Sequence, residues 1–416
     1  MTVRPPWRGV LTDLTPLRVS ADYRRLWLGL SVSQLGQQMT AVAVAIQVFD
    51  LTRSSFAVGA VGLCALVPLV TFGLYGGAVA DAVDRRKLGL VSSTGLWLLS
   101  IALAVQAFAG VGSVALLYVV VALQAACFAV NNPARSAIIP RLLAAELLPS
   151  ANALSTASFN LGYTVGPLLG GVIYGAGGPA AAYTVDCVTF TAALYALFRL
   201  PPVPPLGEVR RAGLASVLEG LRYLRTRPNV LMTFLVDLCA MVLAQPRALF
   251  PAIAGSFYGG GTSTVGVLSA APAIGALAAV SVSGRLGRVR RQGRAVVLSV
   301  LAYGSAVAAL GFTRTLWLGV LFLALSGGAD MVSSVYRNTI LQVATPDELR
   351  GRLQGVFIVV VAGGPRLGDF TAGSLATLTS ETAAIVGGGA ACIGCVLALT
   401  ARYRGFLRYD ARTPHP

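Results

Sequence analysis

The chain has 416 residues, of which 56% are hydrophobic and only 12% charged, and its mean hydropathy is +0.74. Soluble globular proteins carry about 25% charged residues, so this composition excludes an ordinary soluble protein and indicates side chains that mostly face lipid or other helices. The net charge of +16 would favour nucleic acid in a soluble protein, but basic cytoplasmic loops explain it in a membrane protein, and we expect no nucleic-acid partner.

Twelve apolar runs are long enough to cross a bilayer, for which a helix needs about 20 residues. In chain order, the predicted spans are 26–49, 56–80, 88–109, 113–134, 150–175, 179–199, 228–256, 263–284, 294–312, 315–337, 352–378 and 381–401. We therefore predict an all-α membrane protein with twelve transmembrane helices in two pseudo-symmetric six-helix bundles. Its parts are a cytoplasmic N-terminal segment (1–25), an N-terminal bundle (26–199), a cytoplasmic linker with an amphipathic helix (200–227), a C-terminal bundle (228–401) and a cytoplasmic tail (402–416).

The basic residues determine the predicted orientation, because cytoplasmic loops carry an excess of Lys and Arg. Of the 32 basic residues, all but Arg53, Arg247, Arg314 and Arg366 precede the first span, follow an even-numbered span or lie in the middle linker. This distribution places both termini in the cytoplasm. We expect a multi-pass protein of the bacterial plasma membrane, with its first span as the targeting signal.

An internal repeat supports the division into two halves. A shift of 202 residues places Arg135 on Arg337 and Gly162 on Gly364. Two related six-span halves are the plan of transporters that give a central site alternating access to the two sides of a membrane. A channel or a receptor has no comparable need for them.

The loop after the second span contains Gly77, then Asp81, then a basic run that begins at Arg85. This order resembles the G-x-x-x-D-x-x-G-R-R/K signature of the major facilitator superfamily. Two positions depart from the signature, since Ala82 stands where a basic residue is usual and Asp84 where glycine is usual. The resemblance implies a gating role for Gly77, Asp81 and Arg85.

The fifth span carries the whole pattern G-x-x-x-G-P-x-x-G-G, which includes Gly162, Gly166 and Pro167. Small residues four positions apart let a neighbouring backbone approach closely, and proline bends the helix. The pattern resembles the antiporter signature of exporters in the same superfamily, and implies efflux and a gating role for these three residues. A narrower resemblance, to the enterobactin-exporter branch that moves siderophores or drugs, is carried by residues 132–136, 235–241, 245–251, 327–330, 346–352 and 364–369.

Ionisable side chains inside membrane helices are costly and are therefore candidates for function. We predict Asp237, Asp330 and Asp369 as proton-coupling carboxylates. Arg366 lies three residues before Asp369 on the same helix face, so a purely structural ion pair between them is an equal alternative. Asp330 is expected to pair with Arg247 or Arg366 across the cavity.

Arg135 and Arg337, the repeat-related arginines, stand at the inner ends of the fourth and tenth spans. We expect them to form inner-gate ion pairs with Asp81, Glu146 or Glu348, which break when the cavity opens inward.

The predicted substrate cavity is polar but nearly uncharged, and would suit an amphipathic or anionic small molecule. Its candidate residues are Gln34, Gln38, Asn160, Tyr163, Arg247 and Arg366. Hydrogen bonding between helices explains any single uncharged member equally well. Asp50 and Asp186 are expected near the outer membrane face, where interface solvation or helix capping accounts for them.

No G-x-x-x-x-G-K-[ST] motif occurs, so we expect energy from an ion gradient, with proton antiport favoured over sodium. The predicted function is export of siderophore-like or drug-like molecules by alternating access, with no enzymatic activity, cofactor or metal. The alternatives are a lysophospholipid or lipid flippase of the same superfamily, a non-transporting membrane sensor and an uptake permease. We expect a monomer whose partners are its substrate, protons and membrane lipids.

Overall fold

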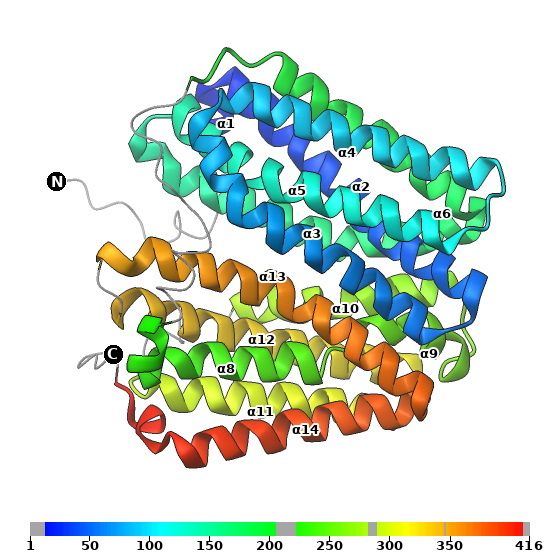
Figure 1. The fold of residues 1–416 in the computed structure, drawn as a ribbon, viewed down its shortest axis with the longest axis vertical. Coiled ribbons are helices and arrows are strands. Elements are labelled where there is room, and N and C mark those ends of the chain that lie inside the picture. Colours follow the sequence, from blue (N-terminus) through cyan, green and yellow to red (C-terminus); the bar gives the residue numbers. More distant parts are fainter. Residues whose placement is uncertain (1–12, 205–221, 282–288, 345–346, 411–416) are drawn as a thin grey trace.

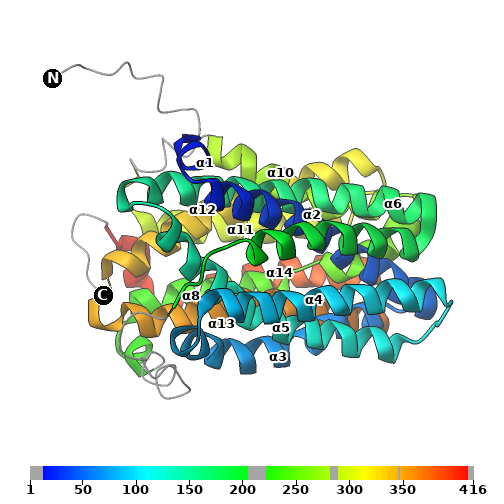
Figure 2. The same ribbon diagram turned by 90° about the horizontal axis from the view of Figure 1, so that it is seen from above.

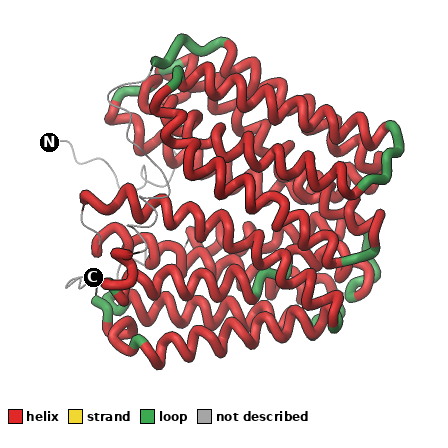
Figure 3. The backbone as a smooth tube through the Cα atoms, viewed as in Figure 1, coloured by secondary structure: helices red, strands yellow, loops and turns green. Residues whose placement is uncertain are grey.

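The computed structural model describes residues 13–204, 222–281, 289–344 and 347–410, with the side chains of 74–82 and 347–359 left out of the description. These residues form helices joined by short loops, and Figure 3 shows no strand among them. Most of the predicted linker helix falls outside this part of the chain. The all-α prediction is confirmed.

The N-terminal half holds the first six predicted spans. They lie in α2 (Ala21–Thr52), α3 (Ser55–Ala82), α4 (Arg85–Phe108), α5 (Val114–Leu142) and α6 (Leu148–Phe198), while α1 (Thr15–Val19) and the short η2 (Ala145–Leu147) connect them. Helix α6 contains both the fifth and the sixth span. The chain turns between them at Gly178, whose φ of 69° and ψ of −171° are open to glycine and strained for other residues.

The C-terminal half holds the other six. Its elements are α8 (Pro228–Leu243), η3 (Arg247–Leu249), α9 (Phe250–Ser256), α10 (Thr262–Ser281), α11 (Gln292–Leu310), α12 (Leu316–Ala344), α13 (Asp347–Leu378), α14 (Glu381–Arg402) and η5 (Arg404–Arg408). The seventh span, predicted as one run over 228–256, is broken between α8 and α9. Pro246 lies in this break and lacks the backbone N–H that a continuous helix requires there.

Local sequence explains several helix starts. The side chains of Ser20, Ser113 and Ser380 accept hydrogen bonds from backbone N–H groups in the first turns of α2, α5 and α14. Asp84 does the same for α4, with its Oδ1 2.8 Å from the amide nitrogen of Arg86 and 3.2 Å from that of Lys87. Asp84, one of the two residues that depart from the superfamily signature, is therefore the N-cap of α4.

The helices have the length and hydropathy of membrane spans. Within the described ranges, nine helical segments are long and apolar enough to cross a bilayer, and one of them is the double span α6. The two remaining predicted spans fall in α2 and α13, which carry more polar residues. The protein is a multi-pass membrane protein.

The two halves form two bundles that lie side by side (Figure 1). The long helices all run across the molecule in roughly one direction (Figure 2). We call the end that carries both termini the inner end and the opposite end, near α9, the outer end. In Figure 1 the bundles converge at the outer end and separate toward the inner end.

Two seams join the halves in their outer parts: α3 lies against α13, and the first segment of α6 lies against α10. Both are lined by glycine. A Cβ added at Gly62 of α3 would lie 2.7 Å from the carbonyl oxygen of Arg366, and one added at Gly171 of α6 would lie 3.0 Å from the Cα atom of Gly266. The backbones thus touch, as small residues permit in membrane helices.

The apolar core follows the same division. One buried cluster continues through both halves, and includes Val44 and Tyr174 of the first half and Ile253 and Leu268 of the second. The buried clusters near the inner end each belong to one half, as in the group around Leu26 and those around Tyr23 and Val230. The halves are therefore packed together at the outer end and are separate cores at the inner end.

Candidate functional site

A cluster of charged residues lies at the junction of the halves. Arg366 and Asp369 belong to α13, next to its seam with α3, and Arg247 begins η3 in the break of the seventh span. Asp369 lies within electrostatic reach of both guanidinium groups, and Arg366 within that of Tyr163 from the other half. We call these four residues the junction cluster. Two cations and one carboxylate give it a net positive charge.

The predicted structural ion pair between Arg366 and Asp369 does not form. Arg366 instead donates a hydrogen bond from Nη1 to the carbonyl oxygen of Ala362, one turn back on α13, at 2.5 Å. Asp369 Oδ1 is buried and has no hydrogen-bond partner among the described residues. The guanidinium groups of the junction cluster are therefore not neutralised by a direct contact with the carboxylate, and remain able to bind an anion.

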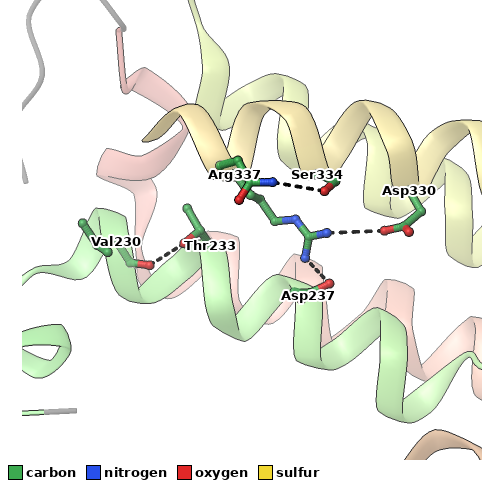
Figure 4. A network of polar contacts seen from close by, with 7 residues as sticks. Val230, Thr233, Asp237, Asp330, Ser334 and Arg337 are labelled. Carbon is green, nitrogen blue, oxygen red and sulfur yellow. Dashed lines mark hydrogen bonds and ion pairs between the residues drawn. The ribbon is translucent and has the colours of Figure 1, made fainter. Parts of the chain in front are cut away.

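A second charged group lies inside the C-terminal bundle (Figure 4). Arg337 of α12 forms an ion pair with Asp237 of α8, and its Nη2 lies 3.4 Å from Oδ1 of Asp330, two turns away on α12. The side chains of Arg337 and Asp237 are about as buried as the apolar core, whereas that of Asp330 is 40% exposed. We call these three residues the carboxylate triad. The expectation that Asp330 pairs with Arg247 or Arg366 was wrong, because Arg337 lies closer on its own helix face.

Arg135, the repeat mate of Arg337, has different surroundings. Its Nη2 donates to the Oγ atom of Ser93 at 3.3 Å, and its guanidinium carbon lies 6.0 Å from the centre of the Phe190 ring. No ion pair joins it to Glu146, which is exposed. The proposed pairs with Asp81 and Glu348 involve side chains outside the described set, as does the gating role of Gly77 and Asp81.

Of the predicted gating residues, Arg85 begins α4, and its amide donates to the carbonyl oxygen of Val203 at 3.1 Å. Pro167 lies in the α6–α10 seam, where its carbonyl oxygen would be 2.5 Å from a Cβ added at Gly266. The seam thus includes part of the glycine signature.

The predicted polar face of α2 turns out to be a helix contact. A Cβ at Gly162 would lie 2.7 Å from Cγ of Gln34, and one at Gly166 would lie 2.6 Å from Cβ of Gln38. Gln38 is 8% exposed. The glycine signature therefore places the stems of these two glutamines directly against α6.

The other two uncharged candidates lie on α6. Asn160 is half-buried and its carbonyl oxygen accepts a hydrogen bond from Thr164. Tyr163 stacks on Phe159, with ring centres 4.5 Å apart, and is the member of this set that approaches Arg366.

The explanation of Asp186 by interface solvation or helix capping was wrong, because this residue is buried inside α6. Its side chain is 1% exposed and accepts a hydrogen bond from Ser100 Oγ at 2.7 Å. The only feature of the sequence related to this burial is Gly36, which has no side chain and faces the carboxylate of Asp186 from α2. Asp50 does lie at the outer end of α2, exposed, 3.8 Å from Arg53.

Comparison with known proteins identifies the family. Residues 11–411 match the family described as transmembrane secretion effectors, which covers nearly the whole chain. The chain belongs to this family of the major facilitator superfamily. It is thus a membrane transporter, in agreement with the twin bundles and the two seams.

Proteins similar to this chain include the enterobactin exporters EntS of Citrobacter koseri and Shigella boydii. They are 28% and 29% identical over 392 residues, which cover 94% of this chain and 94% of each relative. Among solved structures, the nucleoside transporter NupG superposes with a TM-score of 0.71 at 14% identity, and the match covers 94% of this chain and 100% of that one. This likeness supports the major facilitator fold alone.

Proposed function

We propose that this protein exports amphipathic organic anions from the cytoplasm, and that catecholate siderophores are the substrate class. The junction cluster carries the proposal. It sets Arg247 and Arg366 against the single carboxylate of Asp369, at the place where the two halves meet and a substrate is exposed to one side or the other. A planar guanidinium binds oxyanions through paired N–H groups and stacks on aromatic rings, and a catecholate offers both.

Three further observations support export. The glycine signature of α6 lies in a seam between the halves, and the relatives that match nearly the full chain are named as enterobactin exporters. The excess of arginine at the inner end supports a cytoplasmic location for both termini. With that orientation the molecule is closed at its outer end and receives its substrate from the cytoplasm.

Proton antiport is the proposed energy source, with the carboxylate triad as the site of exchange. Two carboxylates share one guanidinium, so a proton bound to Asp330 or Asp237 makes the group neutral. Because Arg337 links α8 to α12, a change in this charge alters the attachment of the two helices. An anion bound beside Asp369 favours the protonated carboxyl there, so direct competition between substrate and proton is not expected at Asp369.

A lipid flippase requires a lateral opening at one of the seams. Both seams are closed by backbone contacts in their outer parts, and no contact between the described residues favours this alternative.

The first test measures binding of a tris-catecholate siderophore to the purified protein. We expect Arg366→Gln to weaken binding by about tenfold or more, because a hydrogen bond to a charged group contributes about 1.5–3 kcal/mol. Asp369→Asn should strengthen binding, since it removes the negative charge that opposes an anion. The matched control is Arg25→Gln, which changes an exposed arginine of α2.

Unchanged binding in Arg366→Gln would rule out the junction cluster as the anion site. A screen of the same protein with antibiotics and lysolipids, read as thermal stabilisation, then identifies the competing substrate class. Transport is measured in proteoliposomes, where an imposed proton gradient should drive siderophore export by the wild type and not by Asp237→Asn.

A further inference from the structure

A buried carboxylate in the N-terminal half has no part in the function proposed above. Asp186, in the second segment of α6, is 1% exposed and lies between α2 and α4. Ser100 of α4 donates a hydrogen bond to its Oδ2 at 2.7 Å. Its Oδ1 has no hydrogen-bond partner within the described chain, and neither has the hydroxyl of Thr40, which faces the same carboxylate from α2.

The Thr40 hydroxyl can serve either protonation state of Asp186, because a hydroxyl both donates and accepts hydrogen bonds. A buried polar atom without a partner is unfavourable by about 1–3 kcal/mol. Thr40 can donate to Oδ1 of the carboxylate, and when a proton is bound at Oδ1 the Thr40 hydroxyl oxygen can accept from it instead. The site is also closely packed, because a Cβ added at Gly36 would lie 2.6 Å from Oδ1. It therefore fits a neutral carboxyl better than a hydrated carboxylate.

No cation neutralises Asp186 in the described part of the chain. The titratable groups within its electrostatic reach are Tyr183 and Cys187 of α6, and neither is basic. Arg135 of α5 contacts Ser93 of α4 instead. The guanidinium of Arg135 also lies 6.0 Å from the centre of the Phe190 ring, one turn after Asp186 on α6, but Arg135 is not among the groups that act on the Asp186 carboxylate.

The elements packed against α6 bring no other charge to this depth. Helix α10 has no charged residue, and apart from Arg135 the charged residues of α2, α4 and α5 lie in the first or last five positions of those helices. Arg18 of α1 and Glu146 of η2 lie at the inner end. A negative charge on Asp186 would thus be isolated inside the bundle, which is strongly unfavourable.

Polar side chains lead from Asp186 to the outer end. One turn before it on α6, Tyr183 donates a hydrogen bond from its hydroxyl to Oε1 of Gln47 at 2.7 Å. Gln47 and Gln106 exchange hydrogen bonds of 3.4 and 3.2 Å, and all three residues are buried. Further out, the hydroxyl of Tyr174 donates to Oδ2 of the exposed Asp50 at 3.0 Å. These side chains offer hydrogen-bond donors and acceptors at successive depths of the bundle.

We propose that Asp186 is a second proton-binding site, which takes up a proton through this polar series and releases it in each transport cycle. The proposal rests on the proton-coupled export proposed above. A proton delivered by water binds Oδ1, the carboxylate becomes a neutral carboxyl, and its O–H donates to Thr40. Release reverses the step and requires water to reach the carboxyl beside Gly36.

Infrared difference spectroscopy of the reconstituted protein between acid and alkaline pH tests the site directly. A protonated carboxyl has a carbonyl-stretch band separate from the bands of the carboxylate. We expect a wild-type band that titrates, is absent from Asp186→Asn and is retained in Asp22→Asn, which changes an exposed carboxylate of α2. Asn is the closest mimic of the neutral carboxyl, so the variant should fold, and Ser100→Ala should shift the midpoint of the band if Asp186 gives rise to it.

Transport of a tris-catecholate siderophore in proteoliposomes is the second test of the role of Asp186. Asp186→Asn should reduce proton-driven export at least tenfold and leave siderophore exchange without a gradient intact. A band that persists in Asp186→Asn, a carboxyl that never titrates, or undiminished proton-driven export overturns the proposal. If the wild type itself shows no proton-driven export, the proposed function fails with it, while the infrared band still decides whether Asp186 titrates.

Discussion

The two halves share a repeated framework but hold their buried charges in different ways. In the C-terminal half, Arg337 contacts Asp237 and Asp330 and ties α8 to α12. In the N-terminal half, Arg135 and Asp186 stand apart, and each contacts neutral groups. One half therefore brings its cation and acids into direct contact, whereas the other keeps a cation and an acid separate.

The repeat itself accounts for this difference. The 202-residue shift that superposes Arg135 on Arg337 places Asp237 on Leu35 and Asp330 on Phe128. The N-terminal half keeps the arginine and lacks both acids. A duplicated scaffold therefore does not imply duplicated chemistry, and a role shown for a residue in one half cannot be transferred to its mate.

We expect Arg337→Gln to cause the largest decrease in the free energy of unfolding. It leaves Asp237 buried without its cation, and breaking a buried pair from one side destabilises a protein by about 3–5 kcal/mol. The free energy of unfolding in detergent, from chemical denaturation, measures the loss. The double variant Arg337→Gln with Asp237→Asn should regain a large part of it, because both charges are then gone.

A smaller effect is expected from the matched change in the other half. Arg135→Gln removes a contact with the Phe190 ring and a hydrogen bond to Ser93 but strands no acid in the described structure, so we expect a loss of about 1 kcal/mol. The same denaturation experiment applies. A loss equal to that of Arg337→Gln would break the comparison, and would point to an acidic partner such as Asp81.

We expect the smallest change in the free energy of unfolding when an exposed ion pair is broken. Arg25 and Asp22 lie 3.0 Å apart on the surface of α2, with side chains 48% and 39% exposed. Surface ion pairs contribute about 0–1 kcal/mol, so Asp22→Asn should change the free energy of unfolding by no more than about 0.5 kcal/mol. A larger change would show that the unfolding assay responds to net charge, and would require the first two results to be measured again at higher salt.

The sequence predicts the spans well, because the length and hydropathy of a membrane helix are local properties. It misses the break before α9, where Pro246 interrupts an otherwise apolar run. The proximity of Asp330 and Arg337 was also available locally, since a separation of seven residues places both on one helix face. The ion pair between Arg337 and Asp237 of α8 could not be predicted in this way, because it depends on how helices that are distant in the chain pack together.

The surroundings of Asp186 show the same limit. Its contacts come from Ser100, 86 residues away, and from Thr40 on a third helix. An isolated aspartate in an apolar run resembles a residue at the membrane interface until its neighbours are known. The contact of Gln34 and Gln38 with α6 was equally beyond the sequence, because a polar helix face is as suitable for a glycine-lined neighbour as for a cavity.

The seam between α3 and α13 has a mechanical consequence for the junction cluster. The carbonyl oxygens that approach Gly59 and Gly62 belong to Asp369 and Arg366, whose side chains form the cluster. Within this single helical turn, the backbone forms the outer closure and the side chains form the proposed anion site. Parting of the seam therefore displaces these side chains by the same movement, so opening of the seam and a change in the proposed site need no relay between them.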